Sequence, residues 1–439
     1  MAASKRLFAL AVLIVVAAIL FKVGESLVPY IERPVRDLRK DGDWHYLNTG
    51  LETIHGFSET GRWWTNTWCG AVPFWRPLTS YALWAMYLLW PPGHMLPRQI
   101  ILVILHLCFT GLATVLLWRL THRRWLVVTT LYLFAGYRPY EPIFQPQAYV
   151  LPVNDLLLDP KNITDTLVGL AILGSLLLLM KGKWVSALIL AAASVGFKEN
   201  GFTTWPLAVL MLGWLRRDAL MAKGGVSYAV SCIRRNAVPI ATWALVFLLL
   251  MGVHFITVGV GFRQGSNSFW IWRLAVFFGW PMLSNLFLFD RTAAFMALFV
   301  FLAILLARRS RFMVRSLALL AAVGMGIGAD AVLQGTSWGV AATRILAQGQ
   351  SLPIALMCFA WLVIVWLARF DWKYIVFGLA MALAAAAPSW MASQTWAHTR
   401  YVASVFMEMA IAAVIIQDIK TVAGLLARRR SGNARSRAG

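Results

Sequence analysis

Long apolar segments recur along the whole chain, separated by shorter stretches of polar residues. An α-helix needs about 17 to 25 mostly apolar residues to cross the hydrocarbon core of a bilayer. The first such segment covers residues 7–24, and the last covers residues 401–419. The pattern therefore predicts an all-α protein, a polytopic transmembrane helical bundle with about 12 spans.

The expected spans are residues 7–24, 99–118, 125–136, 165–180, 184–197, 202–215, 236–258, 292–307, 316–333, 352–368, 373–390 and 401–419. A further apolar segment, residues 77–90, is short and ends at Pro91-Pro92-Gly93, so we expect an interfacial or re-entrant helix there. The membrane domain then covers residues 1–425, with a first extracytoplasmic loop at 25–98. Residues 426–439 are basic and rich in Gly and Ser, which predicts a disordered cytoplasmic tail.

Charged residues make up 13% of the chain, about half of the roughly 25% usual in soluble domains. The formal net charge of +22 would suggest a nucleic-acid partner in a soluble protein. Here Lys and Arg gather in alternate short connections, as the positive-inside rule describes. We therefore expect no nucleic-acid partner. We expect instead that the protein is a multi-pass protein of the cell or inner membrane, in contact with membrane lipids, and that both termini are cytoplasmic. The 4 cysteines show no close spacing, so neither a disulfide framework nor a zinc site is indicated.

Residues 40–78 form the one long polar stretch. Asp41-Gly42-Asp43 lies near its start, and several tryptophans follow within the same stretch. Acids in an exposed loop are ordinarily solvated. Beside aromatic residues at a membrane surface they could instead be desolvated, and such a carboxylate can act as a general base. Two acids separated by one residue could also share a divalent cation, although no further cluster of metal ligands is visible.

Three further positions combine a cation with the end of an apolar segment. Arg76 precedes Pro77, and its guanidinium could either reach lipid headgroups or bind a phosphate with two nitrogens. Lys198 and Glu199 lie between two spans with almost no loop, where a charge costs about 2.5–3.5 kcal/mol. They could pair with each other, or Lys198 could face a phosphate while Glu199 orients it or an acceptor. Arg400 could anchor the last span or bind the same phosphate.

The predicted topology puts Asp41, Asp43, Arg76, Lys198, Glu199 and Arg400 on one side of the membrane. With these residues the chain resembles the GT-C-type integral-membrane glycosyltransferases, which include protein O-mannosyltransferases. The resemblance depends on residues 41–45, on Trp75-Arg76-Pro77-Leu78-Thr79, on His106, on Lys198-Glu199 and on Arg400-Tyr401. It implies that an acid of the first outer loop is catalytic and that the later basic residues bind a lipid phosphate. Asp43 matches best as the acid. Gly42 stands where many relatives have a second acid, which leaves Asp41 as a substitute.

The resemblance implies transfer of a sugar from a polyprenyl-phosphate donor to a glycan, lipid or protein acceptor at the extracytoplasmic face. The chain contains no Gly-rich phosphate loop, which favours a lipid-linked donor over a nucleotide sugar. Two alternatives stay open. A transporter or flippase for a lipid-linked precursor would need ionisable residues in the middle of its spans, where Asp330 is the one we identify. A catalytically inactive scaffold of the same fold would be consistent with Gly42.

Overall fold

The structure is a computed structural model, and it describes residues 2–33, 51–52, 54–66, 74–90, 93–135, 156–157, 159–222, 225–258, 372–391, 401–413, 415–416 and 419. Within these ranges the chain is helical and contains no β-strand. Contacts divide the chain into two compact units. Nearly all of the described residues belong to the unit formed by Met1–Tyr137, Val150–Gly265 and Phe377–Glu408.

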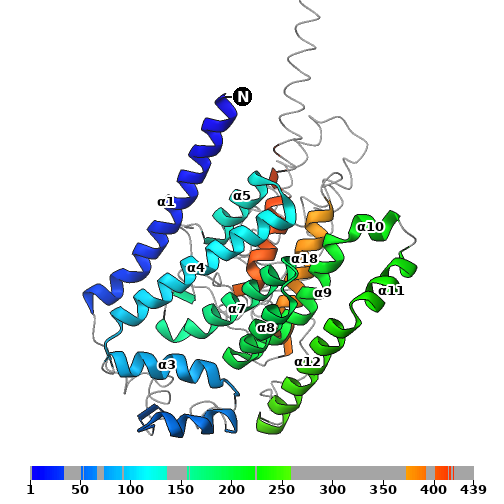
Figure 1. Ribbon diagram of the computed structural model, residues 1–439. Helices are drawn as coiled ribbons and strands as arrows, with labels where there is room; N and C mark the ends of the chain where they lie inside the picture. Colours follow the sequence, from blue (N-terminus) through cyan, green and yellow to red (C-terminus); the bar gives the residue numbers. More distant parts are fainter. Residues whose placement is uncertain are drawn as a thin grey trace, which may run out of the picture. The chain divides into compact units, whose positions relative to one another are not determined.

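Among the described residues, four helices are long and apolar enough to cross a membrane. They are α1 (Ala2–Glu32), α4 (Leu96–Thr121), α7 (Ile163–Met180) and α12 (Ala237–Val258) (Figure 1). At about 1.5 Å per residue, even α7 is close to the thickness of a hydrocarbon core. The composition and length of these helices support a membrane protein.

Other helices occupy several further predicted segments: α5 (Arg124–Ala135), α8 (Trp184–Phe197), α9 (Thr204–Leu215), α18 (Trp372–Met391) and a helix at Tyr401–Ala413. The segment expected to be interfacial is α3 (Pro77–Leu89), which is too short to be an ordinary span. The largest difference in a boundary is at the end of the first helix, since α1 continues to Glu32 instead of ending at residue 24. The expected spans at 292–307, 316–333 and 352–368 lie outside the described residues.

Helices α7 and α8 form an antiparallel hairpin at the centre of this unit. Their connection is Lys181-Gly182-Lys183, where Gly182 has φ +74° and its N–H donates to the Leu179 carbonyl oxygen at 3.0 Å. A left-handed backbone at this position favours glycine. The Ser175 hydroxyl donates to the Ala187 carbonyl oxygen at 2.7 Å and joins the two helices. Helix α7 is mostly buried, whereas α1 and α12 mostly expose apolar side chains, as helices facing lipid do.

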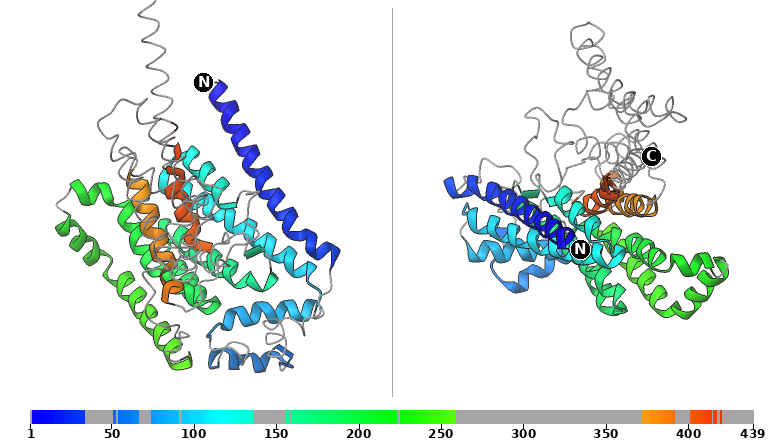
Figure 2. Two further views of the ribbon diagram at one scale, coloured as in Figure 1. Left: turned by 180° about the vertical axis from the view of Figure 1, so that it is seen from behind. Right: turned by 90° about the horizontal axis from the view of Figure 1, so that it is seen from above.

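Helix α4 packs closely along α7 (Figure 2). A Cβ atom at Gly169 would lie 2.6 Å from the buried Phe109 ring, so any larger residue would force that ring to shift. The two helices start at the same end of the bundle, because the Gln99 amide of α4 donates to the Leu157 carbonyl oxygen shortly before α7. At the other end, the Trp214 indole of α9 donates to the Leu120 carbonyl oxygen of α4 at 3.0 Å.

These contacts give the bundle two chemically different ends. One end holds the final turns of α4 and α9 and the start of α5, and it carries Arg119, Arg123, Arg124, Arg216 and Arg217. The Lys181-Gly182-Lys183 turn is the corresponding end of the α7–α8 hairpin. The opposite end of that hairpin lies beside α3, where the Thr79 hydroxyl donates to the Phe197 carbonyl oxygen at 2.6 Å.

Candidate functional site

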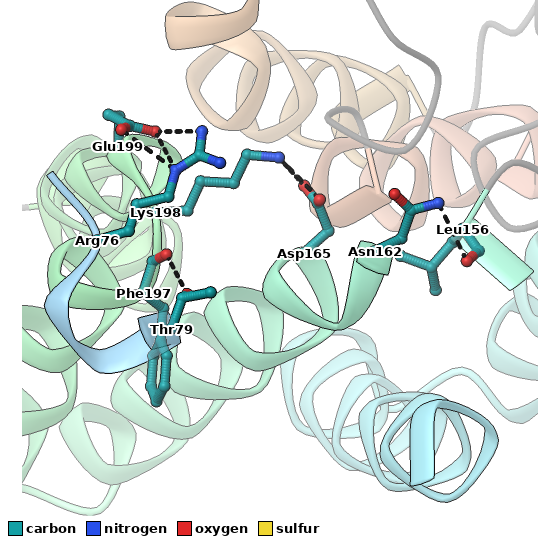
Figure 3. Close-up of polar contacts among 8 residues, drawn as sticks. All are labelled: Arg76, Thr79, Leu156, Asn162, Asp165, Phe197, Lys198 and Glu199. Carbon is teal, nitrogen blue, oxygen red and sulfur yellow. Dashed lines mark hydrogen bonds and ion pairs between the residues drawn. The ribbon is translucent and has the colours of Figure 1, made fainter. Parts of the chain in front are cut away.

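Four charged side chains are buried together at the α3 end of the α7–α8 hairpin (Figure 3). Arg76, Asp165, Lys198 and Glu199 are each at most 9% exposed. They come from three segments: the residue before α3, the first turn of α7, and the junction between α8 and the short helix η5 (Glu199–Thr203). We call these four residues the charged quartet.

The first pair of the quartet joins Arg76 to Glu199. The guanidinium Nη2 donates to Glu199 Oε2 at 2.9 Å, and Nε donates to Oε2 at 3.1 Å and to Oε1 at 3.3 Å. The guanidinium carbon also lies 4.2 Å from the centre of the Phe74 ring. Two donors from one planar group restrict the orientation of the carboxylate as well as its position.

The second pair joins Lys198 to Asp165. The Lys198 ammonium donates to Asp165 Oδ1 at 2.6 Å and to Oδ2 at 2.7 Å. Asp165 lies in the first turn of α7, where the helix dipole favours a negative charge. In the sequence, Asp165 is only the first residue of the predicted span 165–180. The signal that could have found it is an acid at the start of an apolar helix, on the predicted side of Lys198.

A mutual pair between Lys198 and Glu199, which the sequence left open, is therefore wrong. Lys198 has an extended backbone, with φ −162° and ψ 152°. Successive side chains of an extended backbone point in opposite directions. The two neighbours consequently reach partners on different helices, Asp165 on α7 and Arg76 before α3, as Figure 3 shows.

Burial and the neighbouring charges act against each other within the quartet. Burial lowers the pKa of the Lys198 ammonium despite the opposing attraction of Asp165, and the nearby Arg76 guanidinium lowers the pKa further. Burial alone would raise the pKa of Glu199, but the charge and hydrogen bonds of Arg76 bring the pKa below its ordinary value. Glu199 is therefore ionised at neutral pH, and Lys198 has another cation close to it.

The backbone that carries Lys198 and Glu199 is held tightly. Gly201 of η5 passes so close to the backbone of Ser194 and Val195 that a Cβ atom would collide with it. The Ser194 hydroxyl lies within hydrogen-bond distance of the Gly201 carbonyl oxygen and of the Thr204 hydroxyl. The charges at the α8–η5 junction are therefore part of a packed turn.

An aromatic cluster supports the other side of the quartet. Trp75, directly before Arg76, donates from its indole nitrogen to the Trp64 carbonyl oxygen at 3.0 Å. Trp64 ends the short helix η2 (Phe57–Trp64), which packs on α3. The Trp63 and Tyr81 rings meet edge to face at 5.0 Å. The tryptophans of the first loop thus help to hold Arg76 in place.

A small pocket lies beside the quartet and has Asp165 in its wall. Its other lining residues are Val168, Ile172, Asn200, Thr203, Ala385, Tyr401 and Val402. The buried Tyr401 hydroxyl lies 2.7 Å from His106 Nδ1, and its ring centre is 4.2 Å from that of Phe109. The structure thus brings together His106 and Tyr401, two of the residues on which the family resemblance depends.

Glu408 is a buried acid that the sequence analysis overlooked. It lies inside the apolar helix Tyr401–Ala413 and is 3% exposed. A single Glu in an apolar run is itself a signal, because a charge at that depth is expensive and usually has a role.

The predicted site residues are only partly covered by the structure. It brings Arg76, Lys198 and Glu199 together and adds Asp165 to them. Asp41, Asp43 and Arg400 lie outside the described residues, as does Asp330. Within the described part of the chain, no group of three His, Cys, Asp or Glu side chains could hold a metal ion.

No protein-family model matches this chain, and it matches neither a curated protein nor a solved structure.

Proposed function

We propose that this chain is a GT-C-type membrane glycosyltransferase, which transfers a sugar from a polyprenyl-phosphate donor to an acceptor at the extracytoplasmic face. One observation carries the proposal. Arg76 and Lys198, which are 122 residues apart in sequence, are buried near each other at the end of an apolar helical bundle, each held by its own carboxylate. A lipid phosphate at a membrane boundary needs fixed cations of this kind.

The chemistry of sugar transfer explains why fixed cations would help. Negative charge develops on the lipid phosphate as its bond to the sugar breaks. Donors that are already oriented toward that charge stabilise it without reorganising, and burial strengthens their effect. In this mechanism Glu199 and Asp165 are positioning residues, which hold the Arg76 guanidinium and the Lys198 ammonium for the phosphate oxygens.

The remaining roles stay predictions from the sequence. Asp43 would orient or deprotonate the acceptor, with Asp41 as the alternative acid. Arg400 would supply a third cation, and it directly precedes Tyr401, whose side chain lines the pocket beside Asp165. A divalent cation is compatible with the two loop acids but is not required by the quartet.

The proposed topology has about 12 spans, with both termini cytoplasmic and the quartet on the extracytoplasmic side. It is supported by the separation of charge along the α7–α8 hairpin. The basic turn Lys181-Gly182-Lys183 and the quartet lie at opposite ends of that hairpin. By the positive-inside rule, the basic end belongs in the cytoplasm.

A transfer assay in proteoliposomes tests the proposal, with radiolabelled polyprenyl-phosphate sugars and a mixture of lipid and glycan acceptors. We expect product from the wild type and none from Asp43→Asn. The transfer rate of Arg76→Gln should fall by at least about 100-fold, because this variant removes a main electrostatic contact to the phosphate. The matched control is Arg62→Gln, which breaks the half-exposed pair of Arg62 with Glu59 in the same loop. Full activity of Asp43→Asn and Arg76→Gln would overturn the mechanism.

Buried ionisable groups inside apolar helices favour a second candidate, a transporter for a lipid-linked precursor. Glu408 and His106 are both buried within such helices. This candidate predicts movement of a lipid-linked sugar across proteoliposomes without a new glycosidic bond, and loss of that movement in Glu408→Gln. A polyprenyl-phosphate photoprobe that labels the protein without either activity would instead indicate an inactive scaffold.

A further inference from the structure

Two short helices connect α9 to α12 at the basic end of the bundle (Figure 1). They are α10 (Arg217–Ala222) and α11 (Val226–Arg235). The connecting stretch, residues 216–236, contains one acid, Asp218. Its cations are Arg216, Arg217, Lys223, Arg234 and Arg235. We call α10 and α11 the basic helix pair.

Helix α11 separates its apolar and polar residues. Val230 and Ile233 are three positions apart and therefore share a face, and they are 47% and 56% exposed. Ser227, Ser231 and Arg234 lie on the adjoining face. Met221 of α10 is 89% exposed. An exposed apolar face beside arginines is typical of helices that lie in a membrane interface.

The neighbouring helix indicates what covers this face. Only Asn236 separates α11 from α12, whose exposed side chains include Val238, Leu245, Leu248 and Leu249. In a spanning helix those side chains face acyl chains. The exposed apolar residues of α11 therefore continue a lipid-facing surface, at the depth where phosphate headgroups begin.

The positive charge of the basic helix pair favours lipids with anionic headgroups. Arg234 and Arg235 are exposed, and neither forms an ion pair within the described part of the chain. Arg217 is different, because it lies over the Trp214 ring and caps α9 by donating to the Trp214 carbonyl oxygen. Guanidinium groups bind phosphate oxygens through two nitrogens, and an anionic lipid leaves its phosphate charge uncompensated.

We propose that the basic helix pair is a docking surface for anionic phospholipid headgroups. Arg234 and Arg235 bind the phosphates, while Val230, Ile233 and Met221 insert among the upper acyl chains. This surface is independent of the charged quartet, and it would exist in a transferase, a transporter or a scaffold.

A lipid-competition experiment on the full chain tests this surface. The protein is placed in nanodiscs of equal phosphatidylglycerol and phosphatidylcholine, and the lipids that stay bound are counted by native mass spectrometry. Each Arg near an anionic surface contributes about 1 kcal/mol, so Arg234→Gln with Arg235→Gln should reduce the preference for phosphatidylglycerol by about 30-fold. The matched control is Lys181→Gln with Lys183→Gln, which removes the same charge from the same end of the bundle and should lose less of the preference, because an ammonium lacks the paired nitrogens of a guanidinium.

Two outcomes overturn the proposal: no preference in the wild type, or an equal loss in both double variants. A second measurement leaves both arginines in place. A bimane label at Val230→Cys should be quenched by brominated phosphatidylglycerol more strongly than one at Ser231→Cys, with the 4 native cysteines replaced by Ser in both. Equal quenching would show that the apolar face does not enter the lipid. Binding of an acidic polymer in detergent, without any lipid preference, would assign the surface to another partner.

Discussion

Arg76 and Glu199 are 123 residues apart in the chain and form a buried ion pair through two guanidinium nitrogens, the shortest contact being 2.9 Å. The pair joins the start of α3 to the first residue of η5, just after α8. This geometry explains how two charges can be buried here, because each one compensates the other. A buried pair can be neutral for stability as a whole, whereas removal of one partner leaves an uncompensated charge.

This difference leads to a prediction about stability. Glu199→Gln should destabilise the protein by about 3–5 kcal/mol, because Arg76 loses its carboxylate partner in a buried place. The double variant Arg76→Met with Glu199→Leu should recover most of that loss, yet it should not recover sugar transfer. Denaturant unfolding in detergent measures the first effect, and the transfer assay measures the second. Activity in the double variant would make the pair purely structural.

The Lys198–Asp165 pair predicts a pH effect on phosphate binding. Asp165 opposes the lowering of the Lys198 pKa by burial, so Asp165→Asn should lower that pKa further. Lys198 would then lose its proton at a lower pH than in the wild type. Binding of a polyprenyl-phosphate probe, followed across pH 6 to 10, should decline at a lower pH in the variant. An unchanged profile would show that Lys198 does not contact the phosphate.

Acid should weaken the fold through Glu199. Its pKa in the folded chain is below the ordinary value of 4.5, so its stabilising contribution is present above about pH 4.5. The contribution is lost as the pH falls through the lower, folded pKa. The melting temperature should therefore drop below pH 4.5, and the drop should be smaller in Glu199→Gln. The exposed acid Glu59 offers a control, because Glu59→Gln should leave most of this drop in place.

The tight turn after the quartet can be tested with two glycines. Gly201→Ala should destabilise the protein, because the new methyl group would collide with the backbone of Ser194, and strain of this kind typically costs about 1–3 kcal/mol. Gly213→Ala is the control, since nothing lies within 4 Å of a Cβ atom there. Alanine in a helix interior is favoured over glycine by about 0.5–1 kcal/mol, so that variant should be neutral or more stable. Equal effects in thermal unfolding would argue against a tightly packed η5.

The hydrophobic pattern was enough to place most of the described helices. The predicted segment at 184–197 coincides with α8, and the segments at 165–180 and 236–258 differ from α7 and α12 by at most two residues. A long apolar run forms one continuous helix, so local composition alone indicates where such a helix begins and ends. The extension of α1 to Glu32 was not predicted; in the structure Lys22 and Glu25 form an ion pair along that helix at 3.1 Å.

The sequence by itself thus determined a helical fold with helices apolar enough to cross a membrane, and the positions where a charge lies at the end of an apolar segment. Only the tertiary structure decided which charges meet. Arg76 reaches Glu199, and Lys198 reaches Asp165, because α3, α7 and α8 bring their ends together and because an extended backbone turns neighbouring side chains apart. Each of these buried charges needs an oppositely charged partner, since an ion without a partner is unfavourable away from water. The choice of partner depends on packing between distant segments, and no local pattern encodes it.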